Sequence, residues 1–200
     1  RLLRRVAACC GGVGVGMAED AALRETQPRR DSTVVTIACL DFSQPVLEQP
    51  RIQVVEPCWW TGRPHPQLYA SLVDVLGKIW GCRRVVIDST GVGAGVASFL
   101  QGALGRSMVT PFHFTATTKA QLGFDLLAAV NSGRLKVYAR DGSPECLQFW
   151  QEVEGSRCSF RPGRGMDFGA LPGGHDDFLM SLALVVQAAQ YRPRTARGRS

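Results

Sequence analysis

Two short stretches of the chain combine residue types that can do chemistry, and the first surrounds Asp88. An apolar run at 85–87 ends on this aspartate, and Ser-Thr-Gly-Val-Gly follows at 89–93. An acid in this position lies where open α/β sheets place their sites, at the carboxyl end of a strand. The glycines allow backbone N–H groups to approach an anion or ligand closely. The alternative is a helix-capping turn, in which Asp88 or a neighbouring hydroxyl only satisfies backbone donors.

The second stretch is Gly-Gly-His-Asp-Asp at 173–177, which opens the last apolar segment of the chain. Adjacent carboxylates at a helix N-terminus are favoured by the helix dipole, so capping is again the simple interpretation. A cap needs only one acid, however, and carboxylate oxygens are the ligands that hard divalent cations prefer. If Asp88 at a strand end and Asp176 at a helix start converge, they can hold a metal pair that hydrolyses a phosphodiester.

The elements that must position these acids are predicted from the spacing of apolar residues. Strand patterns come first along the chain and are followed by alternating strand and helix patterns, which favours an α/β or α+β domain with a mixed central sheet. The predicted strands are 33–41, 51–57, 83–88, 108–114, 135–139, 158–161 and 166–170, with a first strand within 7–16. The predicted helices are 66–81, 92–104, 118–130, 144–154 and 176–190.

Composition narrows the class of protein. The chain has 200 residues, of which 45% are hydrophobic and 20% charged, so a folded core is expected and disorder throughout is excluded. No apolar stretch reaches the roughly 18 residues that cross a bilayer, and the apolar segment 6–17 has no clear cleavage pattern of a signal peptide. The seven cysteines contain no C-x-x-C pair, which argues against a zinc site and fits a reducing compartment.

The quoted motifs resemble the nuclease domain of the large terminase subunits of tailed bacteriophages. The resemblance is carried by VVIDSTGVGAGVASFL at 85–100, a lysine-bearing helix around Lys119, SGRLKVY at 132–138 and GGHDDFLMSLAL at 173–184. It implies an RNase H-like α/β fold with a central mixed sheet flanked by helices. The expected organisation is an N-terminal segment 1–32 with the first strand and a loop, a nuclease domain 33–190, and a basic disordered tail 191–200.

The same resemblance implies a function and a set of residues. The expected activity is divalent-metal-dependent endonucleolytic cleavage of double-stranded viral DNA during genome packaging, in the host cell cytoplasm, with two Mg²⁺ or Mn²⁺ ions. Position by position, it implies catalytic roles for Asp88, Asp176 and Asp31, metal ligation by Asp88, Asp176 and Asp177, and DNA binding by Lys119, Arg161 and Arg164.

One position departs from the family pattern. The family's first strand carries a metal-binding Asp in a sequence like G-V-D-x-G, whereas this chain has Gly-Val-Gly-Val-Gly at 12–16. Gly14 therefore stands where the acid is expected and offers no carboxylate. Three interpretations follow: Asp31 or Asp20 substitutes for the missing acid, the site binds metal weakly, or this copy has lost its activity.

The resemblance also implies partners, namely double-stranded DNA, an ATPase motor domain of the same subunit, the portal and the small terminase subunit, with no membrane. A motor requires a P-loop of the form G-x-x-x-x-G-K-[ST], which these 200 residues lack. Two alternatives stay open. One is a nuclease-fold domain with weak or no activity that acts as a DNA-binding or assembly module. The other is a Rossmann-like nucleotide-binding domain built on Gly-Val-Gly-Ala-Gly at 91–95, although the third glycine of that fingerprint is missing.

Overall fold

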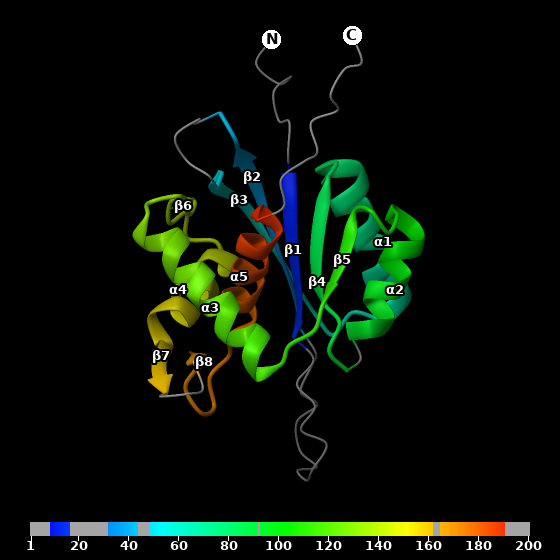
Figure 1. Cartoon of the computed structure of the whole chain (residues 1–200). Helices are drawn as coiled ribbons and strands as arrows, with labels where there is room; N and C mark the ends of the chain where they lie inside the picture. The colour runs from blue at the N-terminus through cyan, green and yellow to red at the C-terminus, as the bar shows by residue number, and fades with distance from the viewer. Residues whose placement is uncertain (1–8, 17–31, 44–48, 92, 162–164, 191–200) are drawn as a thin grey trace, which may run out of the picture.

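A computed structural model describes residues 9–16, 32–43, 49–91, 93–161 and 165–190. A six-stranded sheet and a separate two-stranded hairpin form its β structure, and helices cover both faces of the sheet (Figure 1). The strands are β1 (Cys9–Gly16), β2 (Ser32–Asp41), β3 (Arg51–Thr61), β4 (Arg84–Asp88), β5 (Val109–Phe112), β6 (Leu135–Lys136), β7 (Ser156–Arg161) and β8 (Gly165–Ala170). The helices are α1 (His65–Val73), the π-helix η1 (Asp74–Ile79), α2 (Gly93–Leu104), α3 (Ala116–Asn131), α4 (Pro144–Gly155) and α5 (Asp177–Ala189).

The central sheet is mixed, as predicted. Its strand order is β5-β4-β1-β2-β3-β6. The early strands β1, β2 and β3 pair antiparallel, whereas β4 pairs parallel with β1 and with β5. A Rossmann-like domain requires an essentially parallel sheet whose fingerprint follows the first strand, so this topology rules out that alternative.

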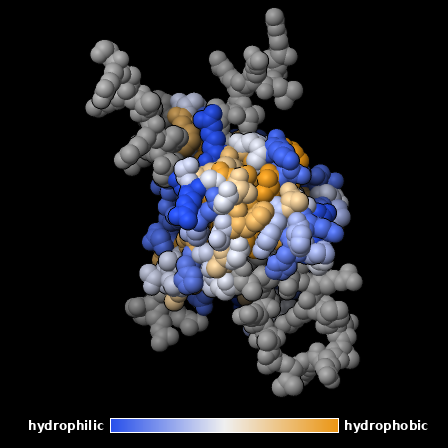
Figure 2. Space-filling model, turned by 90° about the vertical axis from the view of Figure 1, so that its right-hand side faces the viewer, coloured by the Kyte–Doolittle hydropathy of each residue, from blue (hydrophilic) through white to orange (hydrophobic). Residues whose placement is uncertain are grey.

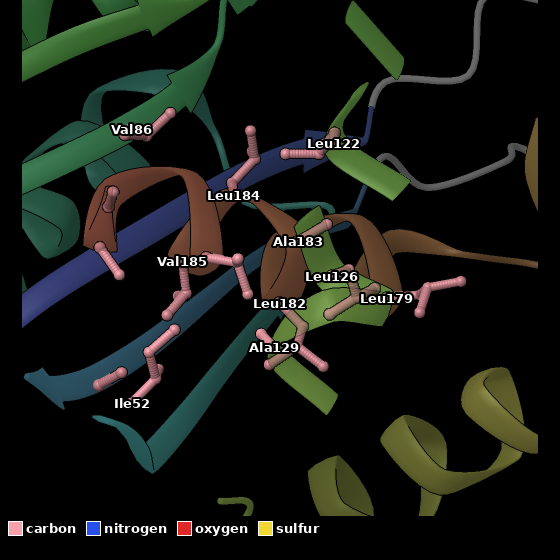
Figure 3. Packing of buried hydrophobic residues seen from close by; sticks show 14 of the residues in the cluster. Ile52, Val86, Leu122, Leu126, Ala129, Leu179, Leu182, Ala183, Leu184 and Val185 are labelled. Atoms are coloured by element: carbon pink, nitrogen blue, oxygen red, sulfur yellow. The ribbon is translucent and has the colours of Figure 1, made fainter. Parts of the chain in front are cut away.

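Alternation along β2 divides the core into two layers, because successive side chains of a strand point to opposite faces. Val34 and Ala38 belong to the cluster that contains α5, while Val35 and Ile37 pack against α1 and α2. The cluster on the α5 side is the larger one. Figure 3 shows α5 between the strands and α3, with Val185 near Ile52 of β3. The apolar helix is thus buried from both sides, which explains why its sequence carries almost no polar residue.

The opposite face of the sheet is covered by α1, η1 and α2. Leu72, Leu76 and Leu100 are fully buried there. The outer surface of this layer is partly apolar: Ile79 and Phe99 are 69% and 40% exposed, and Figure 2 shows apolar side chains gathered on this face with polar ones around them. This surface lies across the sheet from α5 and therefore takes no part in the site described below.

Two predicted elements differ from the structure. The predicted helix 66–81 is interrupted, because the segment after Val73 continues as the π-helix η1. Gly77 lies in η1 against α2, where a Cβ would come within 2.9 Å of Leu104 Cδ2. The predicted strand 135–139 is shortened to two residues, since β6 pairs only with Ile52 and Gln53 at the edge of the sheet.

Among the helices of the described ranges, none has the length and apolarity required to span a membrane.

Candidate metal centre

The register of the sheet brings the candidate residues to one end and one face of the fold. Val13 of β1 pairs with Ile87 of β4, so Gly14 follows at the level of Asp88. Gly14 is also opposite Val34, which belongs to the α5-side cluster together with Val86. Because residues two apart share a face, Asp88 and position 14 both lie on the α5 side. The start of α5, with Asp176 just before it, is at the same end of the sheet (Figure 1).

Asp88 is half-buried in a tight turn at the end of β4. Its Oδ1 accepts a hydrogen bond of 2.7 Å from Thr90 N, so part of the predicted capping role is present. Within the described ranges, Oδ2 receives no protein hydrogen bond and is available to a ligand. Gly93 makes the turn possible, because a Cβ there would lie 2.5 Å from the Asp88 carbonyl oxygen.

Hydrogen bonds tie this turn to the start of α3. Phe114 N donates to Thr90 Oγ1 at 3.0 Å, and Ser89 N donates to Phe112 O at 2.8 Å. Thr115 then begins α3 with a capping box, in which its Oγ1 accepts from Thr118 N. The next residue of the helix is Lys119. The position of this lysine is therefore fixed relative to the Asp88 turn by local hydrogen bonds.

Asp176 does not cap the helix that it precedes. It occupies the N-cap position of α5 but makes no side-chain capping bond. Its Oδ2 instead accepts a hydrogen bond of 3.3 Å from Ala170 N at the end of β8. A Cβ on Gly169 would lie 2.5 Å from Asp176 Oδ2 and 3.3 Å from Lys119 Nζ. The carboxylate and the ammonium group thus both lie near this glycine without forming an ion pair with each other, and the simple capping interpretation of Asp176 is wrong.

The acid that caps α5 is Glu152 of α4, which the sequence analysis missed. It is 5% exposed, and its Oε2 accepts hydrogen bonds from Phe178 N at 2.7 Å and Leu179 N at 3.4 Å. A signal for it exists in the sequence. Glu152 follows the buried residues Cys146 and Phe149 at intervals of three, so an acid falls on the apolar face of α4. An acid there needs buried donors.

The carboxylates at the start of α5 share a partly buried environment. Burial, followed by the negative charges of Glu152 and Asp176, raises the pKa of Asp177 to about 6, against the opposing effect of His175. Burial is also the main cause of the raised pKa of Glu152, while its hydrogen bonds to Gln148 and the α5 amides act in the other direction. Both acids are therefore harder to ionise than in water, mainly because they are buried, and a nearby positive charge would favour their ionised forms.

We expect Asp177→Asn to stabilise the metal-free protein at pH 8 and to have little effect at pH 4. The pKa of Asp177 rises from 3.8 to about 6 on folding, so the folded state favours the protonated carboxyl. The folded protein therefore loses stability at this residue as the pH increases from about 4 to above 6. Removing the charge should raise the free energy of unfolding by about 1–2 kcal/mol at pH 8. Denaturant titrations in EDTA at both pH values measure this. Asp74→Asn, in the exposed ion pair with Lys78, is the control, and an equal effect at both pH values would contradict the prediction.

Several of the predicted site residues cannot be placed against this centre. Asp31, Asp20 and Arg164 lie outside the described residues, and so does the side chain of Arg161 in β7. The residues that the structure does describe contain no group of three or more His, Cys, Asp or Glu side chains able to hold a metal ion. Asp88 and Asp176 offer carboxylate oxygens of the type that a hard cation prefers, and Gly14 offers none.

No family model and no curated protein matches the sequence. Solved structures match over nearly the whole chain. The large terminase nuclease of thermophilic phage G20c has a TM-score of 0.65 at 22% identity, covering 92% of this chain and 83% of that chain. The large terminase nuclease domain of Thermus phage P74-26 has a TM-score of 0.60 at 22% identity, covering 94% and 82%. The nuclease domain of the large terminase subunit of bacterial virus Sf6 has a TM-score of 0.59 at 12% identity, covering 90% and 87%.

Some of these structures contain metal ions. The G20c nuclease was solved with cobalt and with magnesium, and a variant of the Sf6 domain was solved with manganese. At these identities the likeness concerns the fold, and it agrees with the mixed sheet flanked by helices that the sequence predicts. The chain therefore has the RNase H-like fold of the large terminase nuclease domains.

Proposed function

We propose that this chain is a divalent-metal-dependent endonuclease domain that cuts double-stranded viral DNA during genome packaging. The observation that carries the proposal is the placement of Asp88 and Asp176 on one face and at one end of an RNase H-like sheet, with the Asp176 carboxylate released from helix capping. The likeness to terminase nuclease structures that bind magnesium, cobalt or manganese supports it.

In this proposal, Asp88 and Asp176 hold two Mg²⁺ or Mn²⁺ ions, and Asp177 is a supporting or alternative ligand. Bound ions would activate a water molecule and stabilise the leaving oxygen of the phosphodiester. Asp31 or Asp20 could supply the acid that Gly14 lacks. The residues themselves provide hard oxygen ligands of the kind that Mg²⁺ and Mn²⁺ prefer.

Lys119 is the proposed contact to a DNA phosphate, together with Arg161 and Arg164. Its Nζ lies 5.7 Å from the centre of the Phe168 ring, and no ion pair within the described ranges engages it. A half-buried ammonium beside the acids can bind a phosphate oxygen at the point where a metal-bound strand would lie.

The family likeness further supports partners of the packaging machinery, namely the ATPase motor domain, the portal and the small terminase subunit, in the host cytoplasm.

A plasmid cleavage assay tests the proposal. Supercoiled DNA is incubated with the chain in Mn²⁺, in Mg²⁺ and in EDTA. We expect nicked and linear products in Mn²⁺, weaker cleavage in Mg²⁺ and none in EDTA, because Mg²⁺ requires a more complete set of oxygen ligands. DNA binding without cleavage in either metal would instead favour the second candidate, a nuclease-fold binding or assembly module, which the glycine at position 14 supports.

Gly169→Ala should lower the Mn²⁺-dependent nicking rate by at least about tenfold. The new methyl group would lie 2.5 Å from Asp176 Oδ2, so the carboxylate must move, and metal-site neighbours typically affect activity by about 10–100-fold. The backbone φ of +147° at this glycine adds strain. Gly155→Ala is the matched control, because nothing lies within 4 Å of its Cβ position. Normal nicking by folded Gly169→Ala would show that Asp176 is not needed where the structure places it.

A further inference from the structure

We propose that Glu152 is the positioning residue of the metal centre: by capping α5 it keeps the carboxylate of Asp176 free to act as a ligand. This inference rests on the proposed function, but its structural part can be tested without any activity. It assigns a role to a buried acid that lies outside the sequence motifs. Its basis is the hydrogen bonding at the start of α5.

An N-cap side chain ordinarily accepts from the amides two and three residues further on, and Asp is among the best residues for this. For Asp176 those amides are Phe178 N and Leu179 N, and both are bonded to Glu152 instead. Asp176 makes no capping bond and contacts Ala170 N on the hairpin. The helix therefore has the cap it needs, but the cap comes from another helix.

Glu152 is held firmly in this role. Its Oε1 accepts a hydrogen bond of 3.0 Å from Gln148 Nε2, one turn earlier on α4, while Oε2 is engaged by the two amides. Both oxygens are thus occupied, and the carboxylate is buried. Glu152 itself is therefore poorly suited to bind a metal ion. It stabilises the helix start, where the dipole favours negative charge, and leaves the ligand role to Asp176.

Removing this carboxylate should redirect Asp176. Without Glu152 the two amides would be buried and unsatisfied, which is strongly unfavourable. Asp176 is already at the N-cap position, and a change of its backbone ψ from 21° toward the extended value of a capping residue, together with a side-chain rotation, would bring its carboxylate to them. Its carboxylate would then leave the neighbourhood of Gly169 and Lys119. Glu152→Gln behaves differently, because the amide oxygen can still accept both hydrogen bonds.

The decisive experiment combines crystal structures of Glu152→Ala and Glu152→Gln with Mn²⁺ titrations by calorimetry. In the alanine variant we expect Asp176 within hydrogen-bond distance of Phe178 N or Leu179 N, and a Mn²⁺ affinity reduced by about 10–100-fold. The glutamine variant should keep both the carboxylate position and most of the affinity. Glu154→Ala is the control, because Glu154 lies on the same helix as Glu152 but only forms an exposed ion pair with Arg140. Its Mn²⁺ affinity and the position of Asp176 should match those of the wild type.

An alanine variant that is folded, with Asp176 still bonded to Ala170 N, would overturn the proposal. Wild-type Mn²⁺ affinity in that variant would overturn it as well, because a purely structural cap would lower the melting temperature without changing metal binding. If the alanine variant does not fold, Glu152→Asp shortens the side chain by one methylene and is judged in the same way. A wild-type chain that binds no Mn²⁺ contradicts the proposed function, and the position of Asp176 in the variants then decides the role of Glu152.

Discussion

Replacing either Asp88 or Asp176 by asparagine is expected to reduce Mn²⁺-dependent plasmid cleavage by at least roughly 100-fold, since metal-ion stabilisation of a transition state supplies several kcal/mol. Asparagine keeps the size and one oxygen of the side chain but removes the charge that holds a cation. For Asp88, the amide can still accept from Thr90 N, so the turn should survive. For Asp176, the same substitution leaves the bond from Ala170 N possible.

The rate of nicking in Mn²⁺ measures the effect, with circular dichroism melting as the test of folding. Asp74→Asn is the matched control, because this acid lies on η1 across the sheet and only forms an exposed ion pair with Lys78. It should cleave like the wild type, since such pairs contribute little to stability. If a folded Asp88→Asn or Asp176→Asn protein cleaves at a rate within a few-fold of the wild type, the acid that it replaces has no essential role in cleavage.

Much of the fold is predictable because hydrophobic periodicity reports burial directly. The β-branched apolar run at 33–41 predicts a strand, and the structure has β2 there with Val34, Val35 and Ile37 all fully buried. The apolar run before Asp88 likewise predicts an interior parallel strand, and β4 lies between β5 and β1. The last helix is apolar all round, which fits its position between the sheet and α3.

The details of the site were less accessible, because they depend on contacts between residues far apart in the chain. The position of Asp88 at the end of a strand could be predicted from the apolar run before it and the glycines after it, and β4 does end at this residue. The release of Asp176 from capping could not, since it requires Glu152, 24 residues earlier on another helix. The two-residue β6 also depends on a distant neighbour, namely the edge of β3.

Introducing an acid by Gly14→Asp is expected to tighten Mn²⁺ binding by at least about tenfold and to increase cleavage in Mg²⁺, because cation affinity increases with the number of charged ligands. The register supports this, since residue 14 lies beside Asp88 and on the face covered by α5. Mg²⁺ should benefit more than Mn²⁺, because it requires nearly ideal octahedral oxygen ligation. Calorimetric titration and plasmid cleavage in each metal measure the two effects.

The effect of Gly14→Asp on the melting temperature should depend on whether a metal ion is present. In EDTA the added carboxylate repels Asp88 and Asp176, so Gly14→Asp should melt below the wild type. Added Mn²⁺ should then raise its melting temperature by more than it raises that of the wild type, as linkage requires of a tighter site. Gly14→Asn has the same volume without the charge and should show neither gain. The contrary result is a wild type that cleaves robustly in Mg²⁺ and loses this activity in Asp31→Ala or Asp20→Ala. The replaced aspartate would then already supply the missing acid, and a further aspartate at position 14 would only add repulsion.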